Sequence, residues 1–162
     1  MSERVISNAS PLVFLAKIGR LELLVDLFAE VLIPSGAWDE ATRKQDTVTH
    51  SLYALKESGN LTVFSIKNEV VVSAMIGRLH KGEVEAIVGA GEMAIQKVIL
   101  DDGYARGKAK QLGLDVTGTL GLLIAGYRQG LVDDLHTEIE GLMRIGFRIS
   151  DSIVKQVMGI EK

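Results

Sequence analysis

Side chains with carboxylate or amide oxygens recur where strands are predicted to end and helices to begin. They are Asn8, Glu40, Glu83, Glu85, Asp101 and Asp102. Hard divalent cations such as Mg²⁺ and Mn²⁺ take oxygen ligands of this kind. A cation held by such ligands polarises a phosphoryl oxygen and supplies an attacking hydroxide. These residues therefore indicate a metal site for phosphate chemistry, provided that the fold brings them together.

Neighbouring members of this set cannot all face one site. On a helix, Glu83 and Glu85 lie about 200° apart and flank the apolar face on opposite sides, so only one of them points to the site easily. Asp101 and Asp102 would face opposite ways on a strand, and Asp102 is alternatively the N-cap of the next helix. Structural roles stay open for the others as well. Glu40 suits a solvated helix face, and the helix macrodipole favours Glu83 and Glu85 near an N-terminus.

Two further features are candidates for binding phosphate beside such a site. Arg106 and Lys110 are four residues apart and share a helical face, from which they could meet a phosphate backbone. A plain solvated face is the alternative. Thr117 and Thr119 flank Gly118 in a turn that feeds a helix, and a helix N-terminus can bind phosphate. The alternative there is a tight turn with a threonine cap.

Five short strands separated by helices are predicted. The strands cover residues 4–7, 30–33, 61–66, 98–100 and 114–116. Ser10 followed by Pro11 is typical of a helix start, with the serine as N-cap. From that start, the predicted helices cover residues 11–18, 21–27, 35–43, 48–56, 70–79, 83–95, 104–112, 120–129, 134–145 and 151–158. This alternation predicts an open α/β layer fold with a mostly parallel sheet, in which ligands bind at the carboxyl ends of the strands.

Composition narrows the class of protein. The 162 residues suffice for one domain with a sizeable core. The net charge of −3 excludes a large basic field, although a local basic rim can coexist with it. Because there is no cysteine, disulfides, iron–sulfur clusters, cysteine-ligated zinc and thiol catalysis are excluded. The chain shows no apolar run that could span a bilayer and no signal-peptide pattern, so we expect no membrane contact and a cytoplasmic location.

One glycine-rich segment matches the pattern of a dinucleotide-binding motif. Residues 89–94 fit the dinucleotide pattern G-x-G-x-x-A. The chain between them and the next predicted strand is too short for a crossover helix, and lysines occupy the position where an acid should bind the ribose. We therefore interpret the segment as helix, with close packing against the sheet as the reason for its two glycines.

Several sequence blocks, in their order along the chain, resemble the corresponding blocks of a known family. The blocks are residues 5–19 (VISNASPLVFLAKIG), Ile33-Pro34 followed by Glu40, residues 82–87 (GEVEAI), 100–106 (LDDGYAR), 116–121 (VTGTLG) and 146–150 (GFRIS). Together they are very similar to a PIN-like family long regarded as a domain of unknown function. The similarity covers nearly the whole chain, and the single-domain prediction of 1–162 agrees with it.

The resemblance implies a PIN-like three-layer α/β/α sandwich with a metal-dependent nuclease site. Many relatives are ribonuclease toxins of toxin–antitoxin pairs, which implies RNA as substrate, Mg²⁺ or Mn²⁺ as cofactor, a small antitoxin as partner and a homodimer. Position by position, Asn8, Glu40 and Glu83 match the first three acidic positions of the family, and Asp101 or Asp102 matches the fourth. Ser10 matches the hydroxyl residue beside the first.

Three hypotheses follow for the activity. The first is a ribonuclease in which Glu40, Glu83 and Asp101 or Asp102 bind metal while Asn8 supplies a neutral oxygen or orients a bound water. The second is a catalytically degenerate PIN domain that binds RNA or protein, because PIN nucleases usually have Asp where this chain has Asn8. The third is a metal-dependent phosphatase, which the adjacent Asp101-Asp102 suggests but the missing D-x-D pair at the first strand disfavours.

Overall fold

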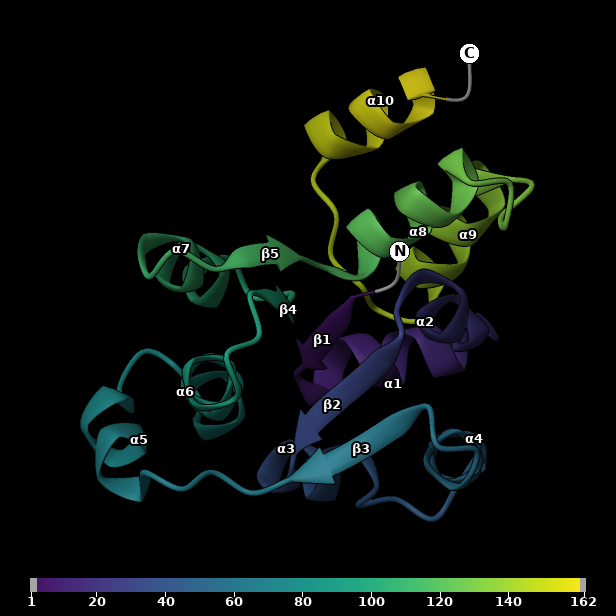
Figure 1. Ribbon diagram of the computed structural model, residues 1–162. Coiled ribbons are helices and arrows are strands. Elements are labelled where there is room, and N and C mark those ends of the chain that lie inside the picture. Colours follow the sequence, from purple (N-terminus) through teal and green to yellow (C-terminus); the bar gives the residue numbers. More distant parts are fainter. Residues whose placement is uncertain (1–2, 161–162) are drawn as a thin grey trace.

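A five-stranded parallel sheet lies at the centre of the protein in the computed structural model, which describes residues 3–160 (Figure 1). The strands are β1 (Arg4–Ser7), β2 (Glu30–Pro34), β3 (Leu61–Phe64), β4 (Lys97–Ile99) and β5 (Asp115–Thr117). Their order across the sheet is β3-β2-β1-β4-β5, and every pairing is parallel. The predicted α/β class and parallel sheet are therefore confirmed.

The strand order reverses direction at β1. This central strand pairs with β2 on one side, where Ile6 is opposite Leu32, and with β4 on the other, where Ile6 is opposite Val98. The connections from β1 and β4 thus leave the sheet on opposite sides of one gap. In parallel sheets this topological switch is where ligands bind, beyond the carboxyl ends of the strands. Asn8 and Asp101 follow β1 and β4 at that edge.

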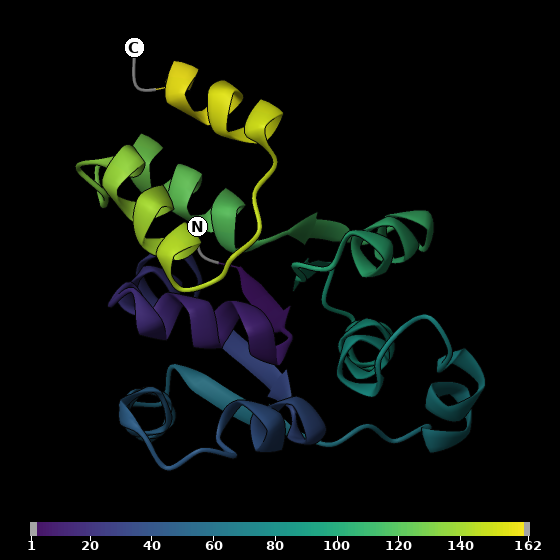
Figure 2. The ribbon, with the colours of Figure 1, turned by 180° about the vertical axis from the view of Figure 1, so that it is seen from behind.

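Helices cover both faces of the sheet, as the two views of the ribbon show (Figures 1 and 2). One face packs against a core built with α1 (Ala9–Lys17), α2 (Glu22–Leu27), α3 (Ser35–Ala41), α4 (Thr47–Glu57), α8 (Thr119–Arg128) and α9 (Leu135–Arg144). The other packs against α5 (Glu69–Met75), α6 (Lys81–Met93) and α7 (Gly103–Gln111). Val5 and Ile6 face different cores because side chains alternate along a strand. The last helix, α10 (Asp151–Ile160), joins the first core through Val157.

The start of α1 differs from the prediction. The helix begins at Ala9 with Asn8 as the N-cap residue, so Ser10 is its second helical residue and not its cap. Pro11 is tolerated there because the first-turn N–H groups have no intrahelical partner. The Asn8 side chain makes no capping hydrogen bond. The early turn from strand into helix therefore leaves both Asn8 and Ser10 available to line a cavity.

The start of α7 and the glycines of α6 agree with the predictions in part. Asp102 is the N-cap of α7, and its Oδ2 accepts a hydrogen bond of 2.9 Å from the Ala105 amide. Residues 89–93 are helical, as interpreted. A Cβ atom at Gly89 would lie 2.6 Å from Cζ of Phe64, which explains that glycine by close packing on the sheet. At Gly91 nothing lies within 4 Å, so packing does not explain the second glycine.

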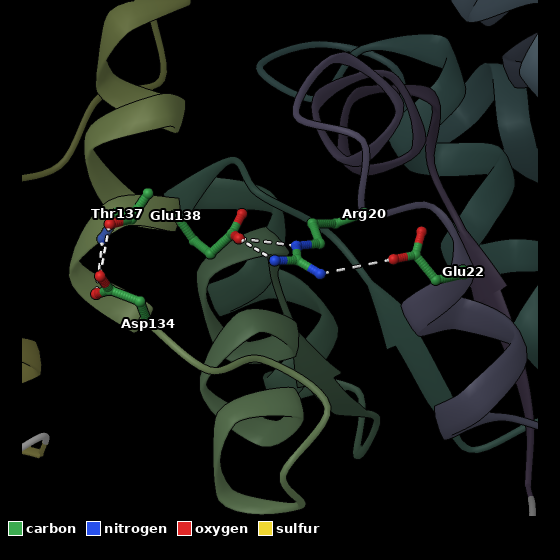
Figure 3. A network of polar contacts seen from close by, with 5 residues as sticks. All are labelled: Arg20, Glu22, Asp134, Thr137 and Glu138. Carbon is green, nitrogen blue, oxygen red and sulfur yellow. Dashed lines mark hydrogen bonds and ion pairs between the residues drawn. The ribbon is translucent and has the colours of Figure 1, made fainter.

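An ion-pair network fastens α9 to the end of α1 (Figure 3). The Arg20 guanidinium donates to Glu138 Oε1 from Nε at 2.8 Å and from Nη2 at 2.5 Å, and these bonds raise the pKa of Arg20. Glu22 Oε1 lies 3.7 Å from Nη1. This network holds α9 in place, and the segment that follows α9 lines the cavity at the strand ends.

Within residues 3–160, no helix is long and apolar enough to cross a membrane.

Candidate active site

A cavity of about 570 Å³ lies at the carboxyl ends of β1 and β4. It is lined by Asn8, Ser10, Phe14, Glu40, His80, Gly82, Glu83, Asp101, Asp102, Gly103, Gly146, Phe147 and Arg148. We call it the acidic cavity. Six of the predicted site residues meet in it, contributed by α1 and its cap, α3, α6 and the segment after β4. The topology of a parallel sheet is what gathers residues so far apart in the chain.

The amide of Asn8 points into this cavity with an unpaired oxygen. Its Oδ1 is buried and has no hydrogen-bond partner among the residues that the structure describes. A Cβ atom at Gly82 would lie 2.9 Å from Asn8 Oδ1 and 3.7 Å from Glu40 Oε2, so the two oxygens converge on the start of α6. A buried polar atom without a partner costs about 1–3 kcal/mol. Such an oxygen marks a place for a donor or a cation.

Glu83 and Glu85 point to different places, as their helical spacing predicts. Glu83 is 5% exposed and lines the acidic cavity, and its Oε1 accepts a hydrogen bond of 2.9 Å from the His80 amide. Burial raises the pKa of Glu83, and the nearby charges of Asp102 and Glu40 raise it further. Glu85 is 4% exposed and instead lies against Gly36 of α3, where its Oε1 has no partner among residues 3–160.

Asp101 is held firmly while Asp102 stands at the rim. Asp101 Oδ1 accepts from the Thr119 amide at 2.7 Å and Oδ2 accepts from the Thr119 hydroxyl at 2.6 Å. The Ser10 hydroxyl is a further donor to this carboxylate. Burial raises the pKa of Asp101, although the Thr119 hydrogen bonds and the Arg106 charge oppose that shift. Asp102 is exposed and is committed through one oxygen to the α7 N-terminus.

Comparison with known families agrees with this geometry. Residues 4–160 match a family model described as a PIN domain. The chain belongs to the PIN-domain family. The fold is therefore of the nuclease type, and the resemblance noted in the sequence blocks is confirmed at the level of the family. No curated protein matches the chain.

The PIN domain does not present its β5–α8 turn to a phosphate in the predicted way. Thr119 is fully buried, and both its amide and its hydroxyl are used by Asp101. Thr117 is half-buried, and a Cβ atom at Gly121 would lie 2.6 Å from its Oγ1, so this hydroxyl faces the first turn of α8. Neither threonine lines the acidic cavity. The turn positions a carboxylate, which a strand-to-helix pattern alone could not distinguish from phosphate binding.

Arg106 and Lys110 lie one turn apart on α7, but their side chains have different surroundings. A Cβ atom at Gly118 would lie 2.8 Å from Arg106 Nη1 and 2.9 Å from Asp101 Oδ1, so the guanidinium lies beside that carboxylate. Arg106 lines a neighbouring cavity of about 410 Å³ under α10, which it shares with Asp101. Lys110 is exposed and lines neither cavity. The predicted pair is therefore not a joint phosphate site at the acidic cavity.

Several lining residues of the PIN domain were not singled out from the sequence. Arg148 and Phe147 reach the acidic cavity from the segment after α9, and His80 does so from the N-cap of α6. The Phe147 ring packs edge-on against Phe14 with centroids 5.0 Å apart. Residues 146–150 formed one of the family blocks, but they follow a helix and no strand, so no positional rule marked them.

The donor set fits a hard divalent cation in chemical type. All the candidate ligands are carboxylate or amide oxygens, and one of them is the unpaired Asn8 Oδ1. Within residues 3–160, no three Asp, Glu, His or Cys side chains are gathered closely enough to hold a metal ion. The donors that converge at Gly82 are instead one amide and one carboxylate. Asn8 therefore contributes a neutral oxygen where an aspartate would contribute a charged one.

Proposed function

We propose that this PIN domain is a Mg²⁺- or Mn²⁺-dependent ribonuclease that hydrolyses RNA phosphodiesters, as the toxin of a toxin–antitoxin pair. One observation carries the proposal. The buried and unpaired Asn8 Oδ1 opens into a cavity lined by Glu40, Glu83, Asp101 and Asp102 at the strand ends of a nuclease-type fold. A small antitoxin, a homodimer and a cytoplasmic location are parts of the same proposal.

Each side chain has a role that follows from its surroundings. Asn8, Glu40 and Glu83 hold the cation together with Asp102 or Asp101. When bound, the metal supplies polarisation of a phosphoryl oxygen and a more acidic attacking water. Thr119 and Ser10 orient the Asp101 carboxylate through hydrogen bonds.

The cation is also what makes the cavity compatible with a phosphate. Four carboxylates repel a phosphodiester unless their charge is neutralised. Arg148 lines the same cavity, where its guanidinium can pair with phosphate oxygens.

A second candidate is a PIN domain that binds RNA or protein without cutting. The specific observation in its favour is Asn8 itself, since an amide carries no charge and binds a cation less strongly than a carboxylate. The lack of three closely gathered carboxylates in the described part of the chain points the same way. The two candidates differ in whether the wild-type protein binds metal and cleaves RNA.

Calorimetric titration with Mn²⁺ is the test, with wild type, Asn8→Asp and Glu40→Gln compared. We expect Asn8→Asp to tighten binding about tenfold through the added ligand charge, and Glu40→Gln to abolish it. Asp39→Asn is the matched control, because Asp39 is the exposed neighbour on α3 and does not line the cavity. Cleavage of labelled RNA by wild type, lost in Glu40→Gln with unchanged thermal unfolding, supports the nuclease. Binding seen only in Asn8→Asp, without wild-type cleavage, supports the binding module.

A further inference from the structure

A third, smaller cavity adjoins the acidic cavity on the α1–α3 side. It has a volume of about 220 Å³ and is lined by Val13, Lys17, Glu40, Ala41, Arg43, Lys44, Asp46 and Val48. Lys17 comes from the last turn of α1, while Arg43 and Lys44 follow the end of α3. We call it the basic cavity. Glu40 lines both cavities, so the two are neighbours along one path over the surface.

The basic cavity carries a surplus of positive charge. Lys17, Arg43 and Lys44 are exposed, and none of them forms an ion pair with any residue in the range 3–160. Of its two carboxylates, Asp46 is committed to the N-terminus of α4, where Oδ1 accepts from the Thr49 amide at 3.1 Å. Three cations against two carboxylates leave the lining of this cavity with a small positive charge, on a molecule whose net charge is −3.

The segment that carries two of these cations is held in place. The Thr42 hydroxyl donates to the Trp38 carbonyl at 2.7 Å, which extends the end of α3. The Thr49 hydroxyl donates to the Lys44 carbonyl. Thr49 is itself 1% exposed, so the loop is anchored to the buried side of α4. The backbone that presents these cations is therefore fixed before a ligand binds, and only their side chains have to be ordered.

We propose that the basic cavity binds a phosphate of the RNA strand next to the phosphodiester held at the acidic cavity. The inference rests on the proposed function, because that function brings RNA to the acidic cavity. A cavity of carboxylates gives a polyanion no affinity of its own, so binding must come from cations nearby. Lys and Arg contacts to phosphate oxygens also fix the register of a strand without reading its bases.

The two cavities and Arg148 define the course of the strand. The basic cavity lies on one side of Glu40, and Arg148 lines the acidic cavity that Glu40 also borders. A strand that places one phosphate between Lys17, Arg43 and Lys44 therefore passes Glu40 before it reaches the acidic residues. Residues from α1 and from the α3–α4 segment thereby become positioning residues for the substrate.

Equilibrium binding of a short labelled single-stranded RNA, followed by fluorescence anisotropy with Ca²⁺ in place of Mg²⁺ or Mn²⁺, tests the inference by binding and not by turnover, because Ca²⁺ is also a hard cation that neutralises the carboxylates. The variant is Lys17→Gln/Arg43→Gln/Lys44→Gln. Its matched control, Lys67→Gln/Arg128→Gln/Lys155→Gln, removes the same charge from exposed residues that line none of these cavities. We expect the first triple variant to weaken binding about tenfold or more, and to lower the slope of log K against log salt by about 2. We expect the control to change binding less than about twofold.

Three outcomes overturn the inference: equal losses in the two triple variants, no loss in the first, or no RNA binding by wild type. Arg43→Gln alone provides a milder second variant, with an expected decrease of about 1 in the salt slope. A selective loss of binding in a protein whose wild type does not cleave RNA with Mn²⁺ supports the basic cavity and refutes the nuclease. Cleavage of RNA by wild type, with unchanged RNA binding in the triple variant, supports the nuclease and refutes the role of the basic cavity.

Discussion

Gly82→Ala should separate the stability of α6 from the chemistry of the acidic cavity. The new methyl carbon would lie 2.9 Å from Asn8 Oδ1 and 3.7 Å from Glu40 Oε2, between the two oxygens that converge there. Asn8 can yield by a few tenths of an ångström because its amide is the end of a side chain. The methyl group then occupies the space in which those oxygens would meet a cation.

The substitution has two opposing effects on the stability of the fold and a single unfavourable effect on Mn²⁺ binding. Replacing glycine in a helix gains up to about 1 kcal/mol, and less in a first turn such as that of Gly82. The shift of Asn8 offsets part of this gain. We therefore expect the melting temperature to change by no more than about 2–4 °C. For Mn²⁺ we expect a loss of at least about tenfold in affinity, or about 1.4 kcal/mol.

Gly91→Ala is the matched control on the same helix. Nothing lies within 4 Å of a Cβ atom at Gly91, so this substitution should raise stability and leave Mn²⁺ binding unchanged. Thermal unfolding and calorimetric titration of the three proteins give both quantities. Wild-type Mn²⁺ affinity in a well-folded Gly82→Ala protein would refute the assignment of Asn8 and Glu40 to one site.

Two further predictions concern buried carboxyl groups. Burial raises the pKa of Glu85, so the folded state holds its proton more tightly than the unfolded state and loses stability as pH rises. Glu85→Gln should therefore melt at a higher temperature than wild type in EDTA, by a margin that grows from about pH 4 to pH 7, and a margin independent of pH would contradict this. Thr119→Val removes the buried 2.6 Å hydrogen bond to Asp101 and should lower the free energy of unfolding in urea by about 1–2 kcal/mol. Thr137→Val, which breaks an exposed 2.7 Å bond to Asp134, should lower it by a smaller amount.

Local chemistry in the sequence was enough for much of the fold. The run at Arg4–Ser7 is a strand as predicted, because its apolar side chains alternate between two cores. Asp102 is an N-cap, which was one of the two roles that the sequence left open for it, because a short side chain with an acceptor oxygen satisfies a first-turn amide wherever the helix lies. The start of α1 was placed two residues late. The Ser10-Pro11 signature is compatible with either position in the first turn, and the end of β1 decided between them.

Topology was also enough to bring Asn8 and Asp101 to one edge of the sheet, since they follow β1 and β4 and the strand ends of a parallel sheet meet there. What each one does there depended on packing. Helical spacing showed that Glu83 and Glu85 diverge, and the family resemblance assigned Glu83 to the site. The approach of α3, with Gly36 against Glu85, is the packing that leaves Glu83 as the one facing the cavity. Thr119 likewise fits a phosphate-binding turn by pattern, and only the position of Asp101 turned its hydroxyl to another use.

The sequence by itself therefore determined the order of elements, the layer architecture and the family, since these depend on periodicity, capping and blocks along the chain. Tertiary structure alone decided which oxygens converge and which cations stand beside them. Asn8 and Gly82 are distant in sequence, and so are Lys17 and Lys44, yet each pair lines one cavity. Contacts of that kind arise from how helices pack across a sheet, and no local pattern carries them.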